Sequence, residues 1–257
     1  MKLQDKVAII TGAGKGIGQG IARVFVKYGA RVVVADWDEE AGAKTAEELR
    51  QSGGDAIFVR CDVSNEEQVK ALVEATLAHY DRLNILVNNA GIGVYTPVLE
   101  TRSEDWDRCL NVNLKGVFLC SKYAIPHIKA AGGGAIVNIA SVHSYQNVGG
   151  TAPYAASKGG VVALTRVMAI DHGRDNIRVN AICPGWIYTP LIQGIFASDP
   201  NPEEAKRAVE RRQILGRLGR PEEVGEAAAF LASDEASYIT AASLMVDNGM
   251  TAQLETW

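Results

Sequence analysis

A tyrosine and a lysine stand four residues apart in the stretch YAASK, residues 154–158. On a helix, residues at this spacing share a face and their side chains can meet. A free tyrosine has a pKa of about 10, but a neighbouring ammonium favours the phenolate and lowers that value. Tyr154 beside Lys158 could therefore take a proton from an alcohol or give one to a carbonyl. Such a pair alone is usually surface packing, so the rest of the sequence must decide.

Ser141 could serve the same proton transfer. It closes an apolar run thirteen residues before Tyr154, where its hydroxyl could bond a substrate oxygen and stabilise developing negative charge. A hydrolase built on Ser141 and His143 is not favoured, because no GxSxG turn surrounds the serine and no acid partner is evident. His143 is interpreted as a pocket wall or a satisfied loop residue. The four histidines form no HExxH pair and no cluster, so no metal site is predicted.

A glycine-rich turn follows the first apolar run, in TGAGKGIGQG at residues 11–20. Glycines there let a pyrophosphate approach the backbone, and the following helix N-terminus supplies N–H groups. The match is to TGxxxGxG, since Ile17 stands where GxGxxG needs glycine, and a P-loop is excluded. Taken alone, this motif could also be a glycine turn between a strand and a helix that binds no ligand. Its position after the first strand favours a dinucleotide.

Acidic residues bear on which dinucleotide is bound. Asp36 ends the second run, where a carboxylate can accept bonds from the adenosine ribose and repel a 2′-phosphate. This predicts NAD, although Lys15 argues mildly for NADP, which stays open. Asp36 could instead only terminate a strand. Asp62 could bind the adenine amino group or cap the next helix, and the sequence does not separate the two.

The segments that position these residues are short apolar runs alternating with amphipathic stretches. The stretches at 39–53 and 65–81 are typical of helices. The apolar runs are rich in valine and isoleucine and nearly continuous, as in strands covered on both faces. They lie at 6–11, 31–36, 56–62, 84–90, 134–141, 177–183 and 243–249. We expect an α/β protein with a doubly wound Rossmann fold, a seven-stranded parallel sheet with helices on both faces.

No linker or repeat divides the 257 residues, so 1–257 is predicted to be a single dinucleotide-binding and catalytic domain. The interruption is 186–220, where a proline-containing segment with two short helices replaces the expected short crossover. Long insertions of this kind are often lids. We expect a flexible substrate flap there, over the carboxyl ends of the strands.

Composition excludes several other classes. Apolar residues make up 47% of the chain and the formal charge is −4, with no basic run, so disorder and a nucleic-acid partner are not expected. The four cysteines have no metal-like spacing and are interpreted as buried free thiols of a reducing compartment. No signal-peptide core or membrane-length apolar run is present. These features predict a cytoplasmic protein without a membrane partner.

Taken together, TGxxxGxG, NNAG at 88–91, Ser141, YAASK and the PG pair at 184–185 resemble the short-chain dehydrogenase/reductase family along essentially the whole chain. The resemblance implies a catalytic set of Asn113, Ser141, Tyr154 and Lys158. Asn113 in NVNLKG would anchor a water in a proton relay to the lysine, and the spacing to Gly116 favours it over Asn111. Ile187 and Thr189 would hold the nicotinamide carboxamide, and Asn88 would brace the sheet. The cofactor-binding residues would be Gly12, Lys15, Gly16, Ile17, Gly18, Asp36, Asp62, Val63, Asn89, Ala90, Gly91, Tyr154, Lys158, Pro184, Gly185, Ile187 and Thr189.

The substrate is the least determined feature. The expected pocket walls are aromatic but carry hydrogen-bonding groups; they are Tyr95, His143, Tyr145, Asn147, Trp186, Tyr188 and Phe196. This mixture favours oxidation or reduction of a secondary alcohol or ketone on a sugar, polyol or similar polar compound, by hydride transfer with NAD(P). Alternatives are reduction of a 3-oxoacyl or other hydrophobic carbonyl compound, and a protein that senses a dinucleotide without catalysis. The resemblance also implies a homotetramer, with residues 250–257 reaching a neighbour. VDNG at 246–249 stands where VDGG is common, a departure that is expected to affect the tetramer edge and not the chemistry.

Overall fold

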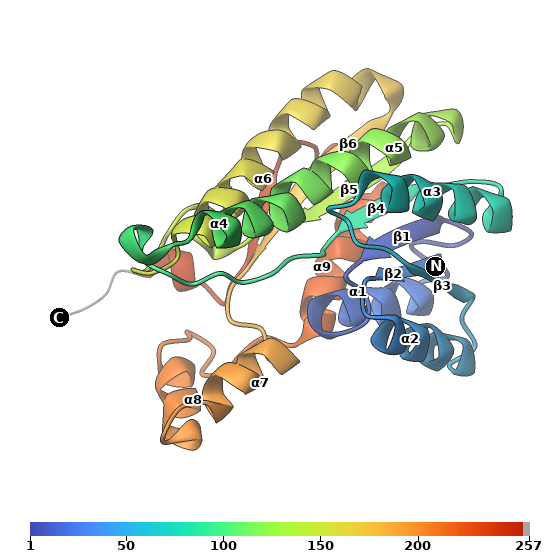
Figure 1. The fold of residues 1–257 in the computed structure, drawn as a ribbon. Helices are drawn as coiled ribbons and strands as arrows, with labels where there is room; N and C mark the ends of the chain where they lie inside the picture. The colour runs from blue at the N-terminus through green and yellow to red at the C-terminus, as the bar shows by residue number, and fades with distance from the viewer. Residues whose placement is uncertain (254–257) are drawn as a thin grey trace.

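The protein forms a single seven-stranded sheet with all strands parallel (Figure 1). The computed structural model describes residues 1–253. The strand order is β3-β2-β1-β4-β5-β6-β7. The strands are β1 Val7–Thr11, β2 Arg31–Asp36, β3 Ala56–Arg60, β4 Ile85–Asn88, β5 Gly134–Ile139, β6 Ile177–Pro184 and β7 Ser243–Val246. The order reverses between β1 and β4, and ligands of such sheets bind outside the carboxyl ends of the strands at that point.

Helices connect the strands and cover both faces (Figure 1). They are α1 Gly16–Lys27, α2 Glu39–Gln51, α3 Glu66–Tyr80, α4 Ser103–Leu110, α5 Gly116–Ala130, α6 Ala152–His172, α7 Pro190–Ala197, α8 Pro202–Arg211 and α9 Pro221–Ala232. Short turns of helix add η1 Val98–Glu100, η2 Asn111–Lys115, η3 Val142–Ser144, η4 Gly173–Asp175, η5 Asp234–Ala236 and η6 Met250–Ala252. The predicted doubly wound fold is confirmed.

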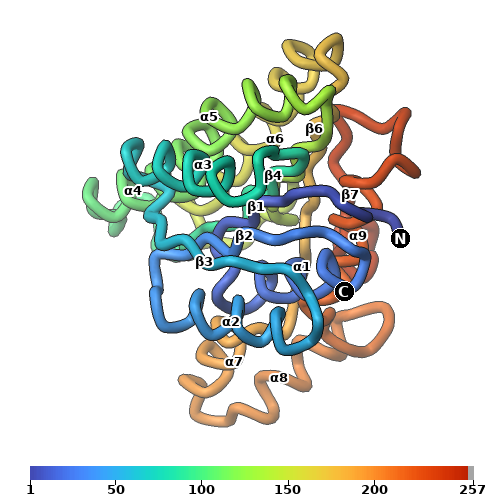
Figure 2. Tube along the Cα trace, turned by 90° about the vertical axis from the view of Figure 1, so that its right-hand side faces the viewer, coloured from blue at the N-terminus to red at the C-terminus, as the bar shows by residue number. Residues whose placement is uncertain are grey.

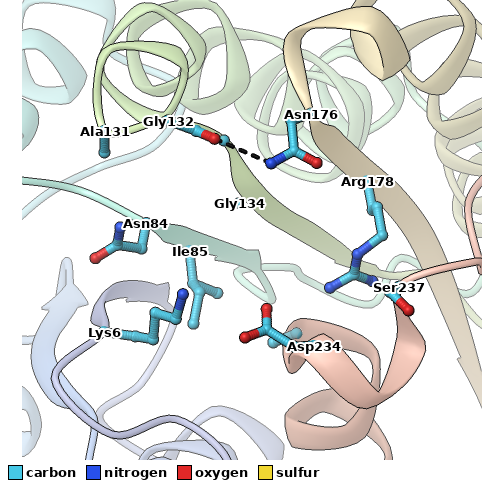
Figure 3. A pocket seen from close by; sticks show the side chains of 12 residues that line it. Lys6, Asn84, Ile85, Ala131, Gly132, Gly134, Asn176, Arg178, Asp234 and Ser237 are labelled. Atoms are coloured by element: carbon cyan, nitrogen blue, oxygen red, sulfur yellow. Dashed lines mark hydrogen bonds between the residues drawn. The ribbon is translucent and has the colours of Figure 1, made fainter.

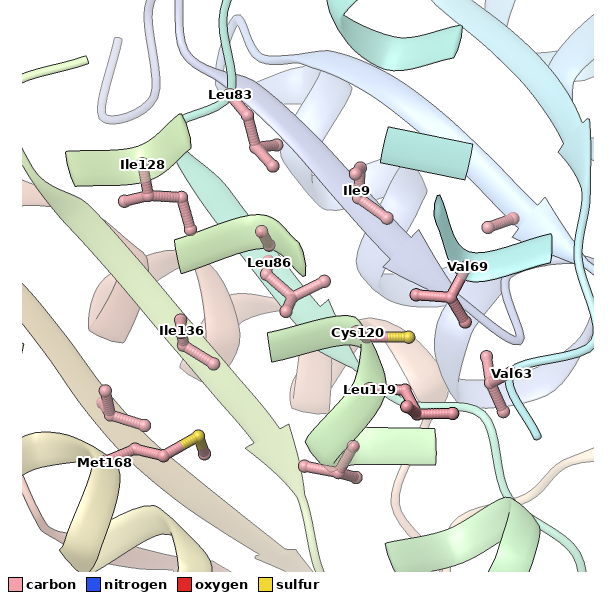
Figure 4. Packing of buried hydrophobic residues seen from close by; sticks show 14 of the residues in the cluster. Ile9, Val63, Val69, Leu83, Leu86, Leu119, Cys120, Ile128, Ile136 and Met168 are labelled. Carbon is pink, nitrogen blue, oxygen red and sulfur yellow. The ribbon is translucent and has the colours of Figure 1, made fainter. Parts of the chain in front are cut away.

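Alternate residues of each strand feed two separate apolar cores. On β1, Ile9 belongs to the core beneath α3, α5 and α6, which is drawn in Figure 4. Ile10, the next residue, belongs to the core shared with α1, α2 and α9. Because both faces of the sheet are buried, every strand residue of β1 is apolar or, at Thr11, buried and hydrogen-bonded. This explains the continuous hydrophobic runs in the sequence.

The two predicted helices at 39–53 and 65–81 are confirmed as α2 and α3, and their starts have physical causes. Asp38 caps α2 by accepting from the backbone of Ala41, and Asn65 caps α3 by accepting from Glu67 and Gln68. Side-chain acceptors of this kind satisfy the free N–H groups of a first helical turn.

The segment 186–220 contains the two short helices that the sequence predicted, α7 and α8. Figures 1 and 2 both show them standing out from the layered body, on the side of the sheet covered by α1 and α2. Their mobility remains a prediction. No helix within residues 1–253 is long and apolar enough to cross a membrane.

Candidate active site

The glycine-rich turn between β1 and α1 is built so that side chains would not fit. A Cβ on Gly18 would overlap the carbonyl oxygen of Gly12, and one on Gly12 would lie 2.8 Å from the Cα of Ala90. Gly12 and Gly16 have φ values of 62° and 60°, which glycine adopts without strain. Ile17 follows as a partly buried residue packed on the core of that face. The bare backbone at the start of α1 fits the pyrophosphate of a dinucleotide.

Asp36 stands beside this turn at the end of β2. Its carboxylate accepts from the backbone N–H of Gly14 at 2.8 Å and from that of Asp38 at 3.0 Å. Gly14 was not among the predicted cofactor residues, yet it orients the carboxylate. Lys15 pairs with Asp38 at 2.7 Å. Its charge is therefore already matched by a second carboxylate.

The residues after β4 connect the turn to the centre of the sheet. The buried Thr11 hydroxyl accepts from the backbone N–H groups of Asn89 and Ala90 at 3.0 and 3.1 Å. The Asn89 side chain donates to the carbonyl oxygens of Thr11 and Gly12, both at 2.9 Å. Asn89 thus holds the turn in place. Thr11 was not among the predicted site residues, although its place at the start of TGxxxGxG was a signal.

Asn88 braces the sheet, as the resemblance implied. Its amide donates to Asn138 on β5 at 2.8 Å and to Ser121 on α5 at 3.2 Å. Asn138 in turn donates to Thr165 on α6. This buried chain fixes β4, β5 and the two helices above them relative to each other.

Asp62 and Val63 lie beyond the end of β3. Asp62 is exposed and accepts from the backbone and hydroxyl of Ser64, so it shapes a turn while Asn65 is the helix cap. Val63 is buried, and a Cβ on Gly116 would lie 2.7 Å from its side chain. An adenine contact at Asp62 stays a prediction.

Tyr154 and Lys158 both lie in the first two turns of α6. The Lys158 Nζ atom is 5.8 Å from the centroid of the Tyr154 ring, and it donates to the carbonyl oxygen of Ile139 at 2.8 Å. Ser141, just beyond β5, is buried, and its hydroxyl acts to lower the pKa of the Tyr154 phenol. Gly91 makes room for the lysine, since a Cβ there would be 3.4 Å from Nζ.

The ionisation of this pair differs from the sequence expectation. Burial raises the pKa of Tyr154, Tyr95 adds to that rise, and the Ser141 hydroxyl opposes it. Burial also lowers the pKa of Lys158 to about 8. The predicted lowering of the Tyr154 pKa is therefore wrong for this structure, because desolvation of the buried phenol is the largest influence on its pKa.

Asn113 lies in η2, a π-helical turn between α4 and α5. Its Oδ1 accepts from the Ile92 N–H at 2.8 Å, and its Nδ2 donates to the Ile92 carbonyl at 2.9 Å. Nδ2 also lies 3.0 Å from the Ser157 hydroxyl, which donates to the Tyr154 carbonyl at 2.7 Å. Asn113 is buried whereas Asn111 is exposed, and the catalytic role of Asn113 stays a prediction. Ser157 was missed, although its place in YAASK was a signal.

Aromatic side chains flank Tyr154 on two sides. The Tyr95 ring centroid is 5.5 Å from that of Tyr154, and the His143 ring is 5.7 Å away in an edge-to-face arrangement. The Nδ1 atom of His143 lies 3.3 Å from the Oδ1 atom of Asn147. Tyr145 instead accepts from Arg166 on the outer side of α6.

The first residues of the flap reach the glycine turn. Gly185 follows Pro184 and lies against Asp247, and Ile187 is buried. A Cβ on Gly16 would lie 3.3 Å from the methyl group of Thr189. The Thr189 hydroxyl accepts from Ile192 at the start of α7, so its proton is free to donate to a ligand. Trp186 stacks on Phe196, and the Lys206 ammonium lies over Tyr188.

A polar cavity lies at the amino ends of β1, β4, β5 and β6 (Figure 3). Its lining includes Lys6, Asn84, Arg178 and Asp234. Parallel strands place this edge opposite the carboxyl ends that carry Ser141 and the glycine turn. The cavity is therefore separate from the candidate active site. Among residues 1–253, no three His, Cys, Asp or Glu side chains form a group that could hold a metal ion.

Comparisons with known proteins agree with this arrangement. Residues 12–251 match the family model described as "Enoyl-(Acyl carrier protein) reductase". The chain is 44% identical to meso-2,3-butanediol dehydrogenase of Serratia marcescens, over 98% of this chain and 97% of that protein. It is 44% identical to L-fucose dehydrogenase of Oryctolagus cuniculus, over 95% of this chain and 84% of that protein. The crystal structure of levodione reductase superposes with a TM-score of 0.94 and 34% identity, covering 98% of this chain and all of that one.

The chain therefore belongs to the short-chain dehydrogenase/reductase family. It is an NAD(P)-dependent oxidoreductase that interconverts a secondary alcohol and a ketone. A protein that only senses dinucleotides is not supported by these relatives.

Proposed function

We propose that this protein is an NAD-dependent dehydrogenase of a polar secondary alcohol that carries a second hydroxyl group. The observation that carries the proposal is the convergence of Ser141, Tyr154 and Lys158 at the carboxyl edge of the sheet, next to the bare glycine turn. The cofactor is implied by the family, and the open backbone at Gly12 and Gly18 fits its pyrophosphate.

Tyr154 is the acid and base of the reaction. NAD, held at the glycine turn, would supply the hydride acceptor. The Ser141 hydroxyl acts to lower the pKa of the phenol and so favours its ionised form. Tyr154 then accepts the alcohol proton during oxidation and returns it during reduction.

Lys158 and Asn113 complete the proton path. Lys158 has its ammonium anchored on Ile139, and its remaining protons are available for the nicotinamide ribose. The Asn113 side chain is hydrogen-bonded to both the N–H and the carbonyl group of Ile92. These two bonds fix its position. The proposed water relay would run between these two residues.

NAD is proposed over NADP because two carboxylates surround the adenosine end of the turn. Asp36 is oriented toward it by Gly14, and Asp38 neutralises Lys15. A 2′-phosphate placed here would meet Asp36 without a free cation from Lys15. A carboxylate facing a phosphate is unfavourable, and an exposed lysine compensates weakly.

The preference for a second hydroxyl rests on His143. When Nδ1 carries the proton it donates to Asn147, which leaves Nε2 as an acceptor on a ring 5.7 Å from that of Tyr154. An acceptor there would bind a hydroxyl next to the reacting carbon. Two relatives are named for substrates of this kind, meso-2,3-butanediol and L-fucose.

A second candidate is an apolar or acyl ketone, favoured by the exposed Leu191 and Ile195 on α7. Steady-state turnover of a panel of polyols, sugars, cyclic ketones and 3-oxoacyl compounds, each with NAD(H) and NADP(H), separates the two. Activity confined to apolar or acyl ketones would overturn the polar substrate, and a preference for NADP would overturn the cofactor.

A homotetramer in the cytoplasm is also proposed. Large apolar side chains on α5 and α6 are solvent-exposed in the single chain, namely Phe118, Val167 and Ile170. Such a surface is typical of a subunit interface. The proposed reach of 250–257 to a neighbour lies partly outside the described residues, since 254–257 are beyond them. Light scattering of the purified protein tests the subunit number.

A further inference from the structure

Asn248, in the loop after β7, holds the end of the flap. Its Oδ1 accepts from the backbone N–H of Leu215 at 2.8 Å, and its Nδ2 donates to the carbonyl of Arg217 at 3.0 Å. Its φ of 58° lies in the left-handed region, which asparagine and glycine adopt more readily than other residues. The sequence expectation limited this position to a tetramer edge and overlooked its two bonds to the flap.

The loop that carries Asn248 contacts both ends of the flap. Gly249 also has a positive φ, and a Cβ there would lie 2.5 Å from the side chain of Ile214. At the other end, a Cβ on Gly185 would lie 2.9 Å from the Cα of Asp247. Residues 247–249 therefore pack against the flap both near its start, after β6, and near its end, before α9.

The two ends of the flap are also joined to each other. Gly219 donates to the Trp186 carbonyl at 2.9 Å and accepts from the Tyr188 N–H at 2.8 Å, forming a short parallel bridge with Ile187. Thr189 follows directly and lies over Gly16. A shift at 215–217 would thus be transmitted through this bridge to the residue beside the glycine turn.

We propose that Asn248 is a positioning residue that restrains opening of α7 and α8, and so sets the position of Thr189 over the cofactor site. The claim that Asn248 restrains α7 and α8 depends only on its hydrogen bonds to Leu215 and Arg217. The part concerning affinity rests on the proposed function, because it assumes that NAD binds at the glycine turn.

Asn248→Gly is the decisive variant, because glycine keeps the left-handed backbone and removes both side-chain bonds. Hydrogen exchange within 190–217, measured by mass spectrometry on the cofactor-free protein, should become about tenfold faster, as expected from the loss of two bonds of ordinary net strength. Exchange in β1 and β5 should stay unchanged. The dissociation constant of NAD⁺, measured by calorimetry, should rise about threefold to tenfold.

Asn248→Asp provides the graded comparison. A carboxylate keeps the acceptor for Leu215 but loses the donor to Arg217, so exchange and affinity should fall between wild type and Asn248→Gly. Unchanged exchange in the flap, or equal acceleration throughout the protein, would overturn the inference. A loosened flap with an unaltered NAD⁺ dissociation constant would overturn the positioning role. If neither the wild type nor the variants bind NAD⁺, the proposed function is wrong. The hydrogen-exchange result would still decide whether Asn248 restrains the flap.

Discussion

The Lys158 ammonium donates a 2.8 Å hydrogen bond to the carbonyl oxygen of Ile139, the last residue of β5. This bond ties α6 to the carboxyl edge of the sheet and fixes the amine 5.8 Å from the centroid of the Tyr154 ring. The hydrogen bond to Ile139 does not compensate fully for the desolvation of the ammonium group. Lys158 is only 5% exposed, and burial lowers its pKa to about 8. The protein therefore carries a charge at neutral pH that its fold disfavours. Functional groups commonly carry such a penalty.

Replacing Lys158 with methionine should stabilise the fold while it abolishes turnover. The pKa difference between the unfolded and folded lysine corresponds to a penalty of about 3 kcal/mol at neutral pH. Loss of the bond to Ile139 offsets about 1 kcal/mol or more of the gain. We expect Lys158→Met to raise the unfolding free energy by roughly 1–2 kcal/mol at pH 7, measured in urea at fixed protein concentration.

The same variant gives a pH test with a definite sign. Below pH 8 the buried lysine is charged and its penalty is complete. Between about pH 8 and 10.5 the folded state has lost the proton while the unfolded state keeps it, so wild-type stability gains on the variant as pH rises. The advantage of Lys158→Met should therefore shrink by about 2 kcal/mol between pH 7 and 9.5. Lys44→Met, at an exposed position on α2, is the control and should show no such trend. A constant difference would contradict the lowered pKa.

Replacing Tyr154 with phenylalanine should remove the acid and base but leave the ring. We expect kcat to fall at least about 100-fold, because general acid–base catalysis typically contributes that much or more. The NAD⁺ dissociation constant should change less than about twofold, since only one hydroxyl is lost. Tyr95→Phe is the matched control, because that ring packs 5.5 Å from Tyr154 and should lose little activity. Comparable losses in the two variants would contradict the role of Tyr154.

Much of this architecture was visible in the sequence, for identifiable reasons. Strands buried on both faces leave continuous apolar runs, as in β1, β2, β4, β5 and β6. The edge strands β3 and β7 are less buried but still carry short apolar runs. Their ends were less predictable. The run at 84–90 ends as a strand at Asn88 because the N–H groups of Asn89 and Ala90 turn to the Thr11 hydroxyl. The run at 243–249 ends at Val246, after which Asn248 and Gly249 adopt left-handed conformations.

In the site, too, features set by neighbouring residues were predicted better than features set by residues far apart in the sequence. The spacing of Tyr154 and Lys158 predicts that they share a helix face, because that depends only on helix geometry. The direction of their pKa shifts depends on burial by elements far apart in sequence, and this was predicted wrongly for Tyr154. The hydrogen bonds from Asn248 to the flap join segments about thirty residues apart, so no local sequence pattern predicts them.

Replacing Asp36 with asparagine should weaken the preference for NAD. An amide keeps one acceptor but turns N–H groups toward Gly14 or Asp38, which donate to the carboxylate. It also removes the charge expected to repel a 2′-phosphate. We expect the ratio of kcat/KM for NAD⁺ to that for NADP⁺ to fall roughly 10- to 100-fold, the range for loss of a charged hydrogen bond.

Asp38→Asn controls for general charge near the turn. It releases Lys15 from its exposed pair but leaves Asp36 in place. Because an exposed lysine compensates weakly for a carboxylate that faces a phosphate, the ratio should fall less than about fivefold. An Asp36→Asn enzyme with an unaltered ratio would show that the carboxylate only shapes the end of β2.

Replacing His143 with phenylalanine should lower activity on diols selectively. The phenyl ring can keep the edge-to-face contact with Tyr154 but has no nitrogen to accept a hydrogen bond. The substrates to compare are meso-2,3-butanediol and 2-butanol, which differ by one hydroxyl. We expect kcat/KM for the diol to fall about tenfold and that for 2-butanol to stay within about twofold, as for loss of one neutral hydrogen bond. His143→Gln, which keeps an acceptor, should recover part of the loss, and Asn147→Ala should reproduce part of it by freeing the ring. Equal losses on both substrates would mean that His143 only supports the Tyr154 ring, and the second hydroxyl would then have to be bound elsewhere.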